Sequence, residues 1–402
     1  MELYRRQVLE RVKPLDPIRL GLLEAHGCVL AEDVVAPADV PAFANSAMDG
    51  YAVRAGDVGD GGELAVIGEI AAGTADVVEP RPGEAVRIMT GAPIPHGVDA
   101  VVPFELTEEL DSRVRLRLAP HPGDNVREAG EDVRAGETVL EAGRRLAAAD
   151  IGMCAAVGLG SVRVHPRPRV VVISTGDELV EPDGPLRRGQ IRDSNSYTLT
   201  TMAREAGATA YRLPIVRDDR NALLLAFEGA MAHADLVVTS GGISAGRYDY
   251  VKDVLAQLGD VRFRKVGMQP GMPQAFGFVM REAGHEVPCF GLPGNPVSAY
   301  VSFEVFVRPT IRRLQGRADL TRPRVTAVLD EPVHSPAHKV SFLRVTLRRD
   351  GDVWHARSTG AQGSGILRSA VLADGLAEIP AEVTEVAGGE RVVVHLLVDP
   401  AA

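Results

Sequence analysis

Residues 169–316 alternate short apolar runs with helical patterns, and this alternation is the strongest constraint on the fold. It predicts a doubly wound α/β domain built on a parallel sheet. Three of the apolar runs end in turns of small residues, at 174–178, 240–244 and 291–296. Loops that leave the carboxyl ends of parallel strands form the ligand sites of such sheets. We therefore expect the three turns to meet at one edge and to bind a ligand.

The residue types in these turns favour an anionic ligand with a divalent cation. Glycines allow backbone N–H groups to approach an anion closely. Four carboxylates follow the strands, and these are Asp177, Glu178, Asp218 and Asp249. Together they would repel one another, whereas a Mg²⁺ ion bridged to substrate phosphates would relieve the repulsion. Each carboxylate taken alone could equally cap a helix.

The turn at 291–296 has two further interpretations. Asn295 can cap the helix that follows, with Pro296 as its first residue. Pro293 and Pro296 also rigidify the loop, which lowers the entropic cost of ordering it around an anion. The Ser240-Gly241-Gly242 turn could likewise be a tight strand-to-helix connection. Neither a Walker A loop nor a dinucleotide-binding Gly-x-Gly-x-x-Gly pattern is present.

The remaining segments predict smaller units. Helices are expected at 4–12, 17–30 and 146–157, and a β-rich segment is expected from 50 to 136. After residue 316 the pattern is typical of short strands, which indicates a small sandwich or barrel.

Bulk properties exclude several classes of protein. A net charge of −10 argues against a nucleic-acid partner. No apolar run approaches the ~18 residues of a membrane span, and the N-terminus lacks the apolar core of a signal peptide. Cys28, Cys154 and Cys289 are far apart, which favours buried thiols in a reduced cytoplasmic compartment. The sequence also lacks the histidine pairs of zinc sites and the Gly-x-Ser-x-Gly elbow of serine hydrolases.

Six motifs taken together resemble the molybdopterin molybdenumtransferases, the MoeA family, which are similar also to the E domain of gephyrin. They occupy residues 45–52, 89–92, 130–132, 174–178, 240–244 and 292–296. The resemblance implies a multidomain α/β plus β homodimer with a doubly wound MoaB/MogA-like α/β domain. It places an elongated linker domain at 1–48 and 137–168, a β-rich domain at 49–136, the α/β domain at 169–316 and a C-terminal β-barrel at 317–402.

The resemblance also implies the substrates and the site. Molybdenum from molybdate would be inserted into adenylylated molybdopterin with release of AMP and with Mg²⁺ as cofactor. A molybdopterin adenylyltransferase is expected as a further partner. The implied catalytic residues are Asp49, Thr90, Asp132, Glu178 and Asp249, the first three reaching the cleft from the partner subunit. The implied metal ligands are Glu178, Asp218 and Asp249. The implied substrate-binding residues are Ser240, Gly241, Gly242, Ser244, Lys265, Pro293, Gly294, Asn295, Pro296, Arg344 and Ser364.

One segment departs from the family pattern. The family commonly has Lys-Pro-Gly-Lys-Pro after Lys265, whereas this chain has Gln269 and Met272 in place of the two lysines. Two anion-binding charges are therefore absent. This leaves two alternatives open, the same enzyme acting on tungstate and a non-catalytic scaffold that binds the pterin.

Overall fold

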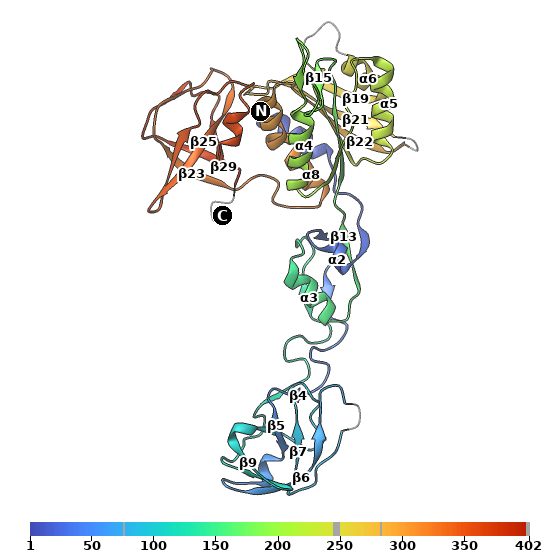
Figure 1. Cartoon of the computed structure of the whole chain (residues 1–402), viewed down its shortest axis with the longest axis vertical. Helices are drawn as coiled ribbons and strands as arrows, with labels where there is room; N and C mark the ends of the chain where they lie inside the picture. Colours follow the sequence, from blue (N-terminus) through green and yellow to red (C-terminus); the bar gives the residue numbers. More distant parts are fainter. Residues whose placement is uncertain (75–76, 244–249, 282–283, 399–402) are drawn as a thin grey trace. The chain divides into compact units, whose positions relative to one another are not determined.

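The computed structural model describes residues 1–74, 77–243, 250–281 and 284–398 (Figure 1). The chain divides into two units. One consists of Met1–Ile18, Gly27–Ala31 and Val164–Ala402, and the other of Arg19–His26 and Glu32–Arg163. The boundaries of the four domains implied by the resemblance stay a prediction. In the described part of the chain, no helix combines the length and the apolarity needed to cross a membrane.

The α/β domain contains a mixed six-stranded sheet of order β17-β14-β18-β22-β21-β19. The first four strands are parallel to one another. The next strand, β21, pairs antiparallel with β22, and β19 pairs antiparallel with β21. The strands are β14 (Arg169–Ser174), β17 (Thr209–Arg212), β18 (Leu236–Ser240), β19 (Gly259–Lys265), β21 (Pro273–Met280) and β22 (Glu286–Leu292). The doubly wound arrangement predicted from the sequence is confirmed for the parallel part, and the antiparallel edge is an addition to it.

Successive side chains of β14 point to opposite faces of the sheet, so each face has its own core. Val170 and Val172 belong to one cluster, and Val171 and Ile173 to the other. The first face is covered by α1 (Glu2–Arg11), α4 (Asn195–Glu205), α7 (Pro296–Ser302), the π-helical η4 (Phe303–Val307) and α8 (Arg308–Leu314). The second face is covered by α5 (Arg220–Met231) and α6 (Tyr250–Leu258).

The C-terminal part forms a closed five-stranded barrel of order β25-β26-β23-β29-β27, because β27 pairs back to β25. Its strands are β23 (Arg324–Leu329), β25 (Val340–Asp350), β26 (Val353–Ser358), β27 (Gly375–Ile379) and β29 (Arg391–Leu396). Outside the closed ring, β24 (Val333–His334) pairs with β28 (Glu385–Val386), and α9 (Arg368–Val371) is a single helical turn. The two-residue strand β20 (Met268–Gln269) leaves the α/β domain and pairs with the start of β25.

The second unit is built mainly on a six-stranded sheet of order β8-β5-β7-β6-β10-β9. These strands are β5 (Gly50–Val53), β6 (Glu63–Ile70), β7 (Glu84–Ile88), β8 (Ala100–Pro103), β9 (Thr107–Leu110) and β10 (Arg113–Leu116). Two short pairs join β3 (Val34–Val35) to β12 (Thr138–Leu140) and β4 (Asn45–Ser46) to β11 (Val126–Arg127). The predicted helix at 146–157 is confirmed as α3 (Ala148–Ala156).

The predicted helix at 17–30 is wrong. This segment forms β1 (Ile18–Gly21), the single turn α2 (Leu22–Ala25) and β2 (Val29–Leu30). Gly27 has a φ of 78°, which ends a helix. Val29 and Leu30 are buried and pair with β13 (Ser161–His165), so tertiary strand pairing overrides the helical pattern.

Candidate functional site

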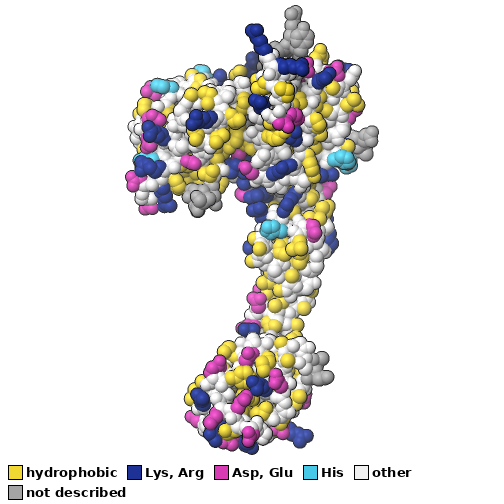
Figure 2. All heavy atoms as spheres, viewed as in Figure 1, with side chains coloured by type: hydrophobic (Ala, Val, Ile, Leu, Met, Phe, Trp, Pro, Cys, Tyr) yellow, Lys and Arg dark blue, Asp and Glu magenta, His cyan; other side chains and the backbone are white. Residues whose placement is uncertain are grey.

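Charge alone does not mark a ligand site on the face of the protein that Figure 2 draws. Figure 2 shows acidic and basic side chains interspersed over the visible face. The site must therefore be located from the geometry of the strand ends.

Three turns lie side by side at the carboxyl edge of the α/β sheet. Ser174 is in register with Ser240, and Ser240 is in register with Leu292. The backbone N–H of Thr175 donates to Ser240 O at 3.4 Å, and that of Gly241 donates to Leu292 O at 3.2 Å. The three turns therefore form one rim, each cross-linked to its neighbour.

A cavity of about 130 Å³ opens in this rim. Six of the residues implied as site residues line it, and these are Glu178, Ser240, Gly241, Gly294, Asn295 and Pro296. The volume suits a phosphate group or another small part of a larger ligand, because sites that enclose a whole small molecule occupy about 300–1,000 Å³.

A larger cavity of about 390 Å³ lies elsewhere, lined in part by Arg11, Lys13, Phe278 and His285. It borders α1 and the hairpin of β21 and β22 rather than the carboxyl ends of the parallel strands. We place the candidate site at the smaller cavity, because open α/β sheets bind ligands at the carboxyl rim.

The Gly241-Gly242 turn has a steric explanation. The two residues have φ values of 93° and 65°, which favour glycine. A Cβ on Gly242 would lie 2.3 Å from Val251 Cγ2, and one on Gly241 would lie 2.9 Å from Thr175 O. Both positions exclude a side chain, so the backbone itself forms this part of the rim.

Two of the predicted metal ligands are described. Glu178 lines the cavity and is exposed. Asp218 accepts a hydrogen bond from Thr175 Oγ1 at 2.6 Å, and its backbone N–H donates to Asp177 Oδ1 at 3.3 Å. Asp249 and Ser244 lie outside the described residues. Within the described ranges, no group of three or more His, Cys, Asp or Glu side chains is arranged to hold a metal ion. The donor set still fits Mg²⁺, which often uses one or two carboxylates together with substrate phosphates.

Asp193 and Asn195 are rim residues that the sequence analysis missed. Asp193 is 2% exposed and accepts hydrogen bonds from Ser174 Oγ (3.2 Å), Ser196 N (3.0 Å) and Ser196 Oγ (2.5 Å). It thereby ties the end of β14 to the first turn of α4. Asn195 Nδ2 then donates to Ser240 Oγ and to Gly294 O, both at 2.8 Å. The two residues hold the three turns together, and the Asp-Ser-Asn sequence before a helical pattern was the signal that could have indicated them.

Ser364, from the loop after β26 of the barrel, contacts the same rim. Asn295 Nδ2 donates to Ser364 Oγ at 3.0 Å, and Val297 N donates to Ser364 O at 3.0 Å. Arg344 lies deeper, 1% exposed, and burial lowers its pKa to about 10. Its guanidinium bonds neutral oxygens, and no described carboxylate lies within ion-pair distance of it.

Lys265 is not part of the described cavity. It is the last residue of β19, is exposed and pairs with Pro273. Gln269 lies nearby in β20, in register with Ser341 of β25. The role of Lys265 in substrate binding stays a prediction, as does that of Pro293, which is absent from the cavity lining although Gly294, Asn295 and Pro296 belong to it.

The second unit contains Asp49, Thr90 and Asp132. Asp49 Oδ1 accepts hydrogen bonds from Thr90 N at 2.6 Å and from Thr90 Oγ1 at 2.7 Å. The backbone N–H and then the hydroxyl of Thr90 hold the pKa of Asp49 below its usual value. Asp132 is exposed, and its backbone N–H donates to Val40 O at 3.0 Å. Asp49 is therefore an exposed carboxylate kept ionised and fixed in direction by one neighbour.

Replacing Thr90 with valine should raise the pKa of Asp49 towards its ordinary value, because one of the donors that stabilise the carboxylate is lost. A carboxyl-carbon NMR titration measures this directly. Thr90→Ser is the matched control, since it keeps the hydroxyl and should leave the pKa low. The same pKa in all three proteins would contradict the described hydrogen bonds.

Asp193→Ala should lower the free energy of unfolding by about 3 kcal/mol, because three donors lose their acceptor in the interior. Asp219→Ala is the control, since Asp219 caps α5 through Ala222 N at an exposed position. That change should cost about 1 kcal/mol. Equal losses in urea denaturation would show that Asp193 is only an ordinary helix cap.

Comparison with known proteins agrees with this architecture. Three family models match the chain, for the "MoeA N-terminal region (domain I and II)" at 1–158, a "Probable molybdopterin binding domain" at 171–313 and the "MoeA C-terminal region (domain IV)" at 326–397. The predicted fold class, an α/β domain of MoaB/MogA type with β-rich domains and a barrel, is thus confirmed.

Curated relatives match over nearly the full length. "Molybdopterin molybdenumtransferase 2" of Mycobacterium tuberculosis is 45% identical, covering 96% of this chain and 97% of the relative. The "Molybdopterin molybdenumtransferase" of Haemophilus influenzae is 38% identical, with 98% of each chain covered. A solved molybdopterin biosynthesis MoeA protein from Pyrococcus horikoshii superposes with a TM-score of 0.81 at 33% identity, over 99% of this chain and 98% of that one. The chain therefore belongs to the molybdopterin molybdenumtransferases, the MoeA family of transferases in molybdenum cofactor biosynthesis.

Proposed function

We propose that this protein inserts molybdenum from molybdate into adenylylated molybdopterin and releases AMP. The observation that carries the proposal is the rim at the carboxyl edge of the α/β sheet, where a glycine turn, carboxylates and a rigid proline loop surround one cavity. The names of the curated relatives supply the substrate class, and the rim supplies groups suited to a phosphorylated ligand.

Different residues of the rim have different proposed roles in binding the ligand. Ser240, Gly241 and Gly242 present backbone and hydroxyl groups to the phosphate part of the ligand. Gly294, Asn295 and Pro296 form the opposite wall. Asn195 keeps the two walls at a fixed separation through its hydrogen bonds to Ser240 and Gly294. Binding at a pre-formed site positions the reacting groups, which is the main contribution a protein makes to such a transfer.

Glu178 and Asp218 would hold Mg²⁺, with Asp249 as the third ligand of the proposed set. A Mg²⁺ ion bound there would supply positive charge that favours departure of AMP. The transfer breaks the bond between AMP and the pterin phosphate, with water adding across it. The two dithiolene thiols of the pterin, which are soft ligands, displace one oxygen of molybdate, which leaves as water with the two thiol protons while both sulfurs bind the metal.

Asp49, Thr90 and Asp132 are proposed to act on the cleft from the partner subunit of a homodimer. The fixed, ionised carboxylate of Asp49 suits the orientation of water or of a substrate hydroxyl. A molybdopterin adenylyltransferase is the proposed source of the adenylylated ligand.

Gln269 and Met272 favour one second candidate, in which tungstate replaces molybdate. These residues stand where the family commonly has two lysines, so the charge around the oxyanion differs from the family pattern. A scaffold that binds the pterin without turnover is the remaining candidate.

The direct test mixes the protein with adenylylated molybdopterin, Mg²⁺ and molybdate, and follows AMP together with metal-bound cofactor. We expect AMP release that depends on molybdate and that stops when EDTA removes Mg²⁺. Asp49→Ala should slow the reaction at least about 100-fold, the usual contribution of a general acid or base. Asp60→Ala is the control, because Asp60 is an exposed carboxylate of the same unit that accepts a hydrogen bond from the backbone N–H of Ala119.

Three other outcomes would redirect the proposal. Tight binding of the pterin without AMP release would favour the scaffold. AMP release with tungstate and not with molybdate would establish the second candidate. An unchanged rate in Asp49→Ala would remove Asp49 from the catalytic residues while leaving the reaction in place.

A further inference from the structure

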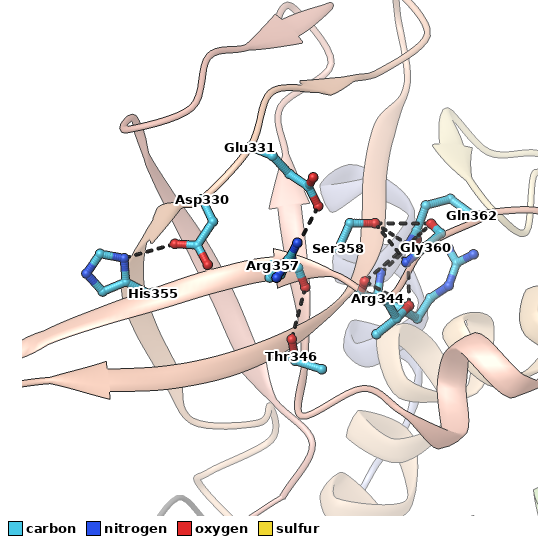
Figure 3. Close-up of polar contacts among 10 residues, drawn as sticks. Asp330, Glu331, Arg344, Thr346, His355, Arg357, Ser358, Gly360 and Gln362 are labelled. Carbon is cyan, nitrogen blue, oxygen red and sulfur yellow. Dashed lines mark hydrogen bonds and ion pairs between the residues drawn. The ribbon is translucent and has the colours of Figure 1, made fainter.

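A side-chain amide completes the hydrogen bonding of the barrel at Arg344. The ladder between β25 and β26 ends at Val345 and Ser358, one residue short of Arg344. On that side Gln362 takes the place of a strand, because its Oε1 accepts from Arg344 N at 2.9 Å and its Nε2 donates to Arg344 O at 3.1 Å (Figure 3). One amide therefore pairs both backbone groups of one residue.

The same amide closes the loop that follows β26. Gln362 Nε2 also lies 3.1 Å from Ser358 Oγ, 3.1 Å from Gly360 O and 3.5 Å from Thr359 Oγ1. Its two N–H groups are thus shared among several oxygens of one turn, which wraps around the amide (Figure 3). Thr359 N and Oγ1 add two more hydrogen bonds to Arg344 O. These hydrogen bonds hold the loop from 359 to 363 to β25 at Arg344.

The fastened residue carries a buried cation without a described acidic partner. The Arg344 guanidinium bonds Ser369 Oγ at 3.2 Å, Phe342 O at 3.2 Å and Gly363 O at 3.5 Å. A guanidinium has five N–H donors, so donors remain for an anion. Burial of a cation without a counter-charge is costly, which favours a role in binding.

The loop continues directly to the cavity rim. Ser364 follows Gly363 and bonds Asn295 and Val297 at the start of α7, beside Pro296 in the cavity lining. The position of Ser364 therefore depends on the same turn that Gln362 holds.

We propose that Gln362 is a positioning residue for anion binding, which sets Arg344 and Ser364 at the junction of the barrel and the α/β rim. This inference rests on the proposed function, because it assigns a role in binding the oxyanion substrate. Gln362 acts through Arg344 and Ser364 and need not touch the substrate itself. Gln269 and Met272 stand in place of two lysines, so their two positive charges are absent from this chain. The buried Arg344 is a remaining cation, and the side-chain amide of Gln362 holds it in position.

The test measures AMP release against molybdate concentration for Gln362→Met, which keeps the length of the side chain and removes its hydrogen bonds. We expect KM for molybdate to rise about tenfold while kcat stays within about threefold. Gln257→Met is the matched control, since Gln257 bonds Arg220 Nη2 on α5 at an exposed position and should leave both constants unchanged. A purely structural role would lower the melting temperature without changing KM.

A second variant keeps the inference testable if Gln362→Met does not fold. Gln362→Glu retains the acceptor for Arg344 N–H and regains a donor only when its carboxyl group is protonated. Near neutral pH the carboxylate cannot donate to Arg344 O and repels an oxyanion, so KM for molybdate should rise at least about tenfold, as in Gln362→Met. A KM equal to that of the unsubstituted protein in the folded variants overturns the role of Gln362. No molybdate-dependent release by the unsubstituted protein overturns the proposed function and this role with it.

Discussion

The parallel register of β14, β18 and β22 is the constraint on which the candidate site depends. Parallel strands point the same way, so their carboxyl ends meet at one edge, and here Ser174, Ser240 and Leu292 are in register across three strands. Two apolar cores fix that register, because the alternating side chains of β14 are buried on opposite faces. A slip of one residue would exchange the two faces and separate the three turns.

Polar side chains provide further hydrogen bonds where the pairing of the strands ends. Asp193 accepts hydrogen bonds from the first turn of α4 and anchors it to Ser174. Asn195 then adds side-chain hydrogen bonds to the turns that follow β18 and β22. Gln362 does the same for the barrel, where β26 ends before Arg344. Each of these residues is polar and stands at the end of a regular element, where backbone groups would otherwise lack partners.

The sequence predicts those parts of the structure that local patterns determine. The helix at 146–157, the turns after β14, β18 and β22, and the small barrel all follow from periodicity and turn chemistry. The segment at 17–30 could not be predicted in this way, because pairing of Val29 and Leu30 with β13 outweighs its helical pattern. Asp193 and Gln362 were missed for a related reason. Their partners Ser174 and Arg344 are about 20 residues away, and only the folded chain brings them together.

The central claim is that the rim at the carboxyl edge binds the phosphate part of adenylylated molybdopterin. A crystal structure of the protein with this ligand tests it most directly. We expect phosphate oxygens within hydrogen-bond distance of the Ser240-Gly241-Gly242 turn, with the rest of the ligand extending towards Ser364. Ligand density in the larger cavity beside Arg11 and Phe278, with the rim empty, would contradict it.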